Sequence, residues 1–283
     1  MRFFTGLHIP AHADKVDAAF ISINRIRKRK SAFPVNDWIM DSGAFTEVAS
    51  HGGYRVTAEQ YAAEIKRWVG NGNLIAAVAQ DFMCEDPILK RVAIAEGALP
   101  APEDFDHQSP TAWKTLDDDV PWLYPTQRQE RIILHQQRTI ERYDDLMSQD
   151  VGGVYIMPVL QGYSPQDYVN HIRMYGDRLT LGMYVGVGSV CKRNSNPAAI
   201  EEVLMAIKRE RPDLRIHGFG IKVTSLGSAI VRGLLYTADS MAWSFAARME
   251  GRNANCITEA IRFSNKIKNM PVQLGLSFLG GPA

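Results

Sequence analysis

The sequence predicts an α/β fold, a TIM (β/α)8 barrel with an insertion after strand 3. The chain has 283 residues, and a TIM barrel takes about 250. Short apolar runs alternate with amphipathic helical runs, which is typical of βα units in a parallel sheet. Polar side chains or glycines follow most of the apolar runs, as at the strand ends that form a barrel's active face. We therefore expect residues 1–283 to form a single barrel domain.

Seven short apolar runs are the expected strands, because a strand covered by helices on both faces is apolar along its length. They are residues 3–7, 38–41, 74–81, 154–160, 181–187, 215–219 and 235–239. A barrel needs an eighth strand. The weakly patterned run 244–248 is the candidate, ahead of a last helix near residues 255–268.

Helix start signals stand between these runs. Thr57 and Gln60 fit a capping box, and Thr126 and Gln129 repeat it before a long amphipathic run. Two further starts pair a capping residue with a proline at the first helical position, Ser164-Pro165 and Asn196-Pro197. These positions indicate helices between the expected strands.

Residues 85–125 interrupt the alternation after the third expected strand. The segment is rich in proline and aspartate and includes the run Asp117-Asp118-Asp119. Long segments without helix or strand periodicity are usually binding loops or mobile segments. We expect an insertion loop region at 85–125.

Composition and charge limit the classes of function. The formal net charge is +1, so nucleic-acid binding requires a local basic patch. The basic run 25–30 fits either such a patch or a solvated helix end. Cys84, Cys191 and Cys256 stand far apart without a CxxC pair, which argues against a disulfide framework and a four-ligand zinc site.

No apolar run reaches the roughly 18 residues of a membrane span. The first residues lack the basic, apolar and small-residue order of a signal peptide. We therefore expect a cytoplasmic protein without a membrane partner.

Three aspartates follow expected strands: Asp41, Asp81 and Asp239. Any one of them fits a helix cap equally well. Because the carboxyl ends of parallel strands meet at one edge, we expect the three to converge. Crowded carboxylates raise each other's pKa values, so that one is protonated while another is ionised. The cleavage of a glycosidic bond by a pair of carboxyl groups uses one protonated and one ionised group in this way.

The motif at 41–45, Asp-Ser-Gly-Ala-Phe, resembles the DSGGF motif of tRNA-guanine transglycosylases. Residues 80–84, 159–162 and 238–240 follow in the same order as that superfamily's base-recognition and nucleophile motifs. A closer likeness covers almost the whole chain: the 7-deazapurine DNA-modification transglycosylases of phages and bacteria. The run 238–248, Ala-Asp-Ser-Met-Ala-Trp-Ser-Phe-Ala-Ala-Arg, is the most specific part of it.

This resemblance implies a double displacement. Asp239 would attack C1′ of the target nucleotide and expel guanine, and Asp41 would carry the proton to the leaving base. Asp81 would read the N1–H and 2-amino edge of the base. The remaining substrate-binding residues that the resemblance suggests are Gln161, Ser42, Gly186 and Gly188 as polar or backbone contacts, and Phe45, Phe82 and Trp243 as stacking rings.

The implied partners are DNA and a free 7-deazaguanine base (preQ0-like), in the host cytoplasm if a phage encodes the protein. Lys192, Arg193, Lys222 and Arg248 follow strand ends, where they fit contacts to DNA phosphates or solvated loop charge equally well. No cofactor and no metal are expected, because one glycosidic bond is exchanged for another. His8 and His217 have no carboxylate at ligand spacing beside them.

Three alternatives stay open. The first is a tRNA-guanine transglycosylase, although the Cys-x-Cys-x-x-Cys zinc motif of those enzymes is absent. The second is a non-catalytic subunit that only binds nucleic acid or a partner. The third is an unrelated barrel hydrolase.

Overall fold

The computed structural model describes residues 1–116, 120–190 and 196–271. Its strands form one parallel sheet with the order β5-β4-β3-β2-β1-β9-β8-β7-β6. The strands are β1 (Arg2–Gly6), β2 (Ala18–Ser22), β3 (Asp37–Asp41), β4 (Asn73–Val78), β5 (Ile156–Met157), β6 (Val159–Leu160), β7 (Tyr184–Val187), β8 (Arg215–Gly218) and β9 (Thr237–Ser240).

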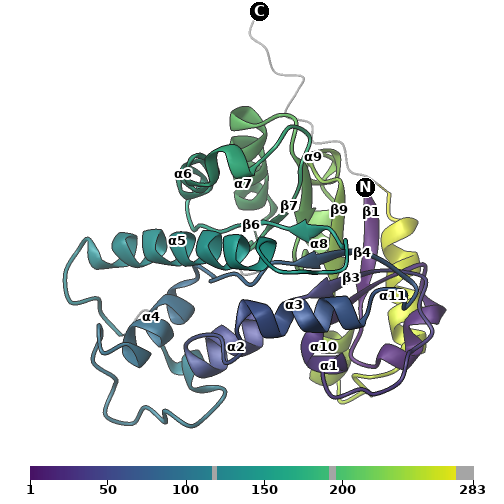
Figure 1. The fold of residues 1–283 in the computed structure, drawn as a ribbon, viewed down its shortest axis with the longest axis horizontal. Coiled ribbons are helices and arrows are strands. Elements are labelled where there is room, and N and C mark those ends of the chain that lie inside the picture. The colour runs from purple at the N-terminus through teal and green to yellow at the C-terminus, as the bar shows by residue number, and fades with distance from the viewer. Residues whose placement is uncertain (117–119, 191–195, 272–283) are drawn as a thin grey trace, which may run out of the picture.

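The two ends of this strand order are neighbours in the chain. Only Pro158 separates β5 from β6, and proline has no N–H for a ladder. β5 pairs with β4, whereas β6 pairs with β7. The sheet is therefore a nearly closed, barrel-like structure with helices around it (Figure 1).

Helices follow most of the strands. The α-helices are α1 (Ile23–Ile26), α2 (Ala44–His51), α3 (Ala58–Arg67), α4 (Asp86–Ala95), α5 (Gln127–Met147), α6 (Pro165–Tyr175), α7 (Pro197–Glu210), α8 (Val223–Leu226), α9 (Ala229–Leu234), α10 (Ala242–Met249) and α11 (Ile257–Lys268). Short 3-10 helices lie at η1 (Pro10–Lys15), η2 (Ala112–Thr115) and η3 (Gly176–Arg178). Among the described residues, none of the helices is both long and apolar enough to cross a membrane.

All seven expected strands overlap an observed one, and the expected strand 154–160 contains two, β5 and β6. The candidate eighth strand was wrong, and one strand was missed. Residues 244–248 lie in α10, not in a strand. The strand that sequence reasoning missed is β2, whose five residues run straight into the apolar residues of α1. Short apolar runs do not distinguish a buried strand from a buried helix.

The capping signals had mixed outcomes. Thr57 and Gln60 form the predicted capping box, and Ser164 and Asn196 cap α6 and α7. Thr126 does not cap α5, because its backbone is already helical and its hydroxyl donates to Glu130 Oε1 at 2.8 Å.

The segment 85–125 is more ordered than the sequence suggested. It contains α4 and η2, and α4 packs against α2 and α5. A small hydrophobic core of its own includes Ile94, Leu99, Phe105 and Leu116. Because β2 was missed, this segment follows the fourth strand of the chain rather than the third.

Alternation along the strands decides what points into the barrel. The interior cluster includes Phe4 of β1, Phe20 of β2 and Ile39 of β3. Side chains two residues apart on a strand share a face, so Asp41 continues the inward line of Ile39. Asp239 pairs in register with Phe4. Two carboxylates thus enter the barrel above its apolar core.

Candidate active site

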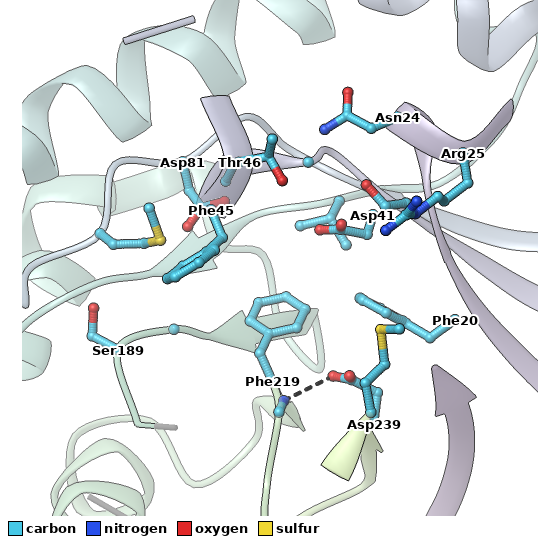
Figure 2. A pocket seen from close by; sticks show the side chains of 18 of the residues that line it. Phe20, Asn24, Arg25, Asp41, Phe45, Thr46, Asp81, Ser189, Phe219 and Asp239 are labelled. Carbon is cyan, nitrogen blue, oxygen red and sulfur yellow. Dashed lines mark hydrogen bonds between the residues drawn. The ribbon is translucent and has the colours of Figure 1, made fainter. Parts of the chain in front are cut away.

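One cavity of about 590 Å³ opens where the strands end. Its lining includes Asp41 at the end of β3, Asp81 after β4 and Asp239 in β9. Gln161, Gly188 and Phe45 also line it. Figure 2 shows Asp41 and Asp239 pointing into this cavity from different strands, with Asp81 farther along it. The structure therefore brings the three acidic side chains together.

Asp239 is held in one orientation by two donors. Its Oδ1 lies 3.1 Å from the backbone nitrogen of Gly220 and 3.2 Å from His217 Nε2. The His217 Nδ1 lies 2.7 Å from Thr237 Oγ1. A neutral imidazole that donates from Nε2 accepts at Nδ1, and the hydroxyls of Thr237 and Tyr184 both lie within hydrogen-bond distance of that nitrogen. No described residue bonds to Asp239 Oδ2, so this oxygen is available to a ligand.

Asp41 lies in a setting that favours the protonated acid. Burial and, less strongly, the nearby charge of Asp239 raise the pKa of Asp41 to about 6, against hydrogen bonds from Ser22 and Gly43. A carboxyl with this pKa holds a proton in part of the population near neutral pH. It can therefore serve as a proton donor and, once ionised, as an acceptor.

Asp81 begins a buried chain of polar groups. The Gln161 Nε2 donates to Asp81 Oδ2, and Gln161 Oε1 lies 2.7 Å from Ser189 Oγ. Ser189 also lies 3.0 Å from Glu85 Oε2 and accepts from the Cys84 backbone N–H. Burial raises the pKa of Asp81 to about 7, with the Gln161 hydrogen bond opposing and the Asp41 and Glu85 charges adding to the rise.

Gly188 allows the Gln161 amide to sit where it does. A Cβ at this position would lie 2.1 Å from Gln161 Nε2, far inside van der Waals contact. Gly186 lies deeper and does not line the cavity. A Cβ there would lie 2.4 Å from the Phe219 ring, so this glycine makes room for an aromatic side chain that does line it.

The aromatic lining differs from the expected one. Phe45 is 45% exposed and lines the cavity. Phe82 packs against Tyr54 and His135 behind the lining, and the buried Trp243 donates from Nε1 to the Gly6 carbonyl at 2.9 Å. The rings that sequence reasoning missed are Phe20 and Phe219, whose centroids lie 5.9 Å apart.

The remaining expected residues lie around the site. Ser42 is buried next to Asp41 without lining the cavity. Lys222 and Arg248 are exposed, at the start of α8 and in α10. Lys192 and Arg193 fall outside the described residues. Within the described ranges, no three His, Cys, Asp or Glu side chains are grouped to hold a metal ion.

From the basic run 25–30, only Arg25 lines the cavity. Arg29 donates to the backbone carbonyls of Ser31 and Ala32, and Arg27 lies 4.0 Å from Glu47. Arg25 follows β2, so the signal that could have found it was the missed strand.

Comparison with protein families identifies one family whose model matches most of the chain. The model of the family described as deoxypurine in DNA protein A (DpdA) matches residues 1–111 and 105–274. Among curated proteins, none matches the chain. The family match covers nearly the whole chain and every residue named above in the cavity. The protein thus belongs to the deoxypurine in DNA protein A family, which is linked to the 7-deazaguanine modification of DNA.

Proposed function

We propose that this protein is a DNA-guanine transglycosylase, a single TIM-barrel domain that exchanges guanine in DNA for a 7-deazaguanine base such as preQ0. The main support is the convergence of Asp239, Asp41 and Asp81 on one cavity, with one Asp239 oxygen held and the other open to a ligand. The family match supports DNA as the substrate.

In the first half-reaction, Asp239 Oδ2 attacks C1′ of a nucleotide that has left its stack. The C1′–N9 bond breaks as the C1′–O bond forms, and the protonated Asp41 donates its proton to the departing guanine. The products are free guanine, a covalent glycosyl–Asp239 ester and ionised Asp41. The raised pKa of Asp41 supports its role as the acid.

In the second half-reaction, ionised Asp41 takes the N9 proton of the incoming 7-deazaguanine. N9 then attacks C1′, the ester bond breaks, and the Asp239 carboxylate is released. Two displacements at the same carbon retain its configuration. Each half-reaction makes one bond to C1′ and breaks one, so the scheme needs no redox group and no metal.

The hydrogen-bonded side chains of Asp81 and Gln161, at the other end of the cavity, select the base. Ionised Asp81 accepts from the N1–H and 2-amino group of guanine. One Gln161 N–H is used by Asp81, and the second is available for the base oxygen O6. Phe45, Phe20 and Phe219 supply apolar surface for the ring.

The test is base exchange followed by nucleoside mass spectrometry. DNA carrying labelled guanine is incubated with the protein and preQ0, and parallel reactions contain tRNA. We expect label release and a 7-deazaguanine deoxynucleoside from DNA only. Asp239→Asn should lower exchange at least 1,000-fold, since it removes the nucleophile, whereas Asp145→Asn on the exposed face of α5 should be unchanged.

Three outcomes would contradict the proposal. Exchange on tRNA but not on DNA would assign the protein to the tRNA branch. Guanine release without incorporation of the deazaguanine would indicate a hydrolase. Full activity of Asp239→Asn would rule out the covalent route, which denaturing electrophoresis of a trapped protein–DNA adduct checks directly.

A further inference from the structure

The rim of the cavity carries an arginine that is oriented by a neutral group. Arg25 is exposed, and its Nη2 lies 3.1 Å from His8 Nδ1. In the described part of the chain, no carboxylate lies within ion-pair distance of Arg25, in contrast to Arg27 beside Glu47. Its positive charge is therefore not cancelled by the contact that positions it.

His8 is suited to this role because it stays neutral. Burial, followed by the charges of Arg25 and Arg248, lowers the pKa of His8. Its Nε2 lies 2.8 Å from Oγ of the fully buried Ser244. A neutral imidazole has one donor and one acceptor. Nε2–H thus donates to Ser244, and Nδ1 accepts from the Arg25 guanidinium.

Arg25 lines a cavity that is otherwise acidic, and Arg248 of α10 is near enough to His8 for its charge to act on that side chain. Four carboxyl groups line it: Asp41, Asp81, Glu85 and Asp239. Such a lining repels a polyanion, and the net charge of the chain is only +1. Local cations at the rim are needed to hold DNA there. Figure 2 places Arg25 beside Asp41 at the edge of the cavity.

We propose that Arg25, positioned by His8 and assisted by Arg248, binds a phosphodiester of DNA next to the target nucleotide. This inference rests on the proposed function. The phosphates are joined to the same deoxyribose whose C1′ must reach Asp239, so a sugar at that carboxylate brings them to the rim. The forked donors of a guanidinium match two phosphate oxygens. His8 acts as a positioning residue and touches no substrate atom.

The test measures DNA affinity as a function of salt, with the full chain and a labelled oligonucleotide. Each lost phosphate contact makes the slope of log K against log [salt] shallower by about 0.9 for duplex and 0.7 for single-stranded DNA. We expect that change for Arg25→Ala. Arg25→Lys should keep the slope but bind more weakly, because it keeps the charge without the fork. Arg209→Ala, at an exposed position of α7, is the control for net charge.

His8→Gln tests the positioning role separately. It leaves the charge of Arg25 in place, so the salt slope should stay at the wild-type value. The KM for DNA should rise several-fold while the KM for the free base stays unchanged. An equal rise in both KM values would overturn the positioning role, since it would indicate general damage to the cavity.

The outcomes separate this site from the proposed function. If Arg25→Ala has the same salt slope as wild type and Arg209→Ala, the phosphate site is wrong, whether or not base exchange occurs. If the slope changes but wild-type protein exchanges no base, the site stands and the proposed chemistry fails.

Discussion

The proposed reaction should proceed from a protonation state of Asp41 and Asp81 that only a minority of molecules have. The first half-reaction needs Asp41 protonated and Asp81 ionised. The pKa of Asp41 is raised to about 6 and that of Asp81 to about 7. As pH rises, Asp41 loses its proton before Asp81 does. The productive form is therefore a minor species at every pH.

The abundance of the productive form follows from the pKa values of Asp41 and Asp81. At about pH 6.5, roughly a quarter of molecules have protonated Asp41 and roughly a quarter have ionised Asp81, so about 6% are productive. About 1.5 pH units to either side, the productive fraction is near 1%. We expect kcat/KM for DNA to be bell-shaped, with a maximum near pH 6.5 and about sixfold lower values near pH 5 and pH 8.

Asp81→Asn distinguishes this reasoning from a generic bell-shaped profile. It removes the group that must ionise and leaves only the Asp41 titration. From about pH 6.5 to pH 5, the wild-type rate should fall about sixfold, whereas the rate of the variant should rise about fourfold from a lower baseline. The assay is the initial rate of labelled guanine release at subsaturating DNA, with circular dichroism as the check on folding. A variant whose rate also falls toward pH 5 would refute the assignment of Asp81.

Two further predictions concern packing around the site. Gly188→Ala should lower kcat/KM about 10- to 100-fold, because the new Cβ would lie 2.1 Å from Gln161 Nε2 and displace the amide. The control is Gly53→Ala, because nothing lies within 4 Å of a Cβ at that position. Equal activity of the two variants would argue against a role for the Gln161 amide. Ile21→Ala should lower the free energy of unfolding by about 2–5 kcal/mol in urea denaturation, because Ile21 of β2 is fully buried. A loss under about 0.5 kcal/mol, the range of surface substitutions, would mean that β2 is not part of the core.

Local sequence patterns were sufficient to predict the acidic cluster. Asp41, Asp81 and Asp239 each follow an apolar run, and parallel strands end at a common edge whatever the details of packing. The prediction therefore needed only the strand positions near these residues. An error in one strand, the missed β2, left the acidic cluster unaffected but concealed Phe20 and Arg25.

Partners distant in sequence could not be predicted in the same way. Phe45 and Phe82 each stand close to a predicted site aspartate, yet Phe45 lines the cavity and Phe82 packs against Tyr54 and His135. The difference depends on the direction in which the chain leaves each strand. Periodicity does not encode that direction, because it describes regular segments and not the turns between them.

The sequence by itself determined the alternating α/β pattern, most strands and the set of aspartates. Only the tertiary structure decided which carboxylate is held by His217 and Gly220, which rings line the cavity, and which arginine of the run 25–30 reaches it. The physical reason is the distance along the chain between the residues that interact. Strand and helix patterns arise between residues a few positions apart, whereas the orientation of Asp239 and the free charge of Arg25 depend on side chains that meet only when the barrel closes.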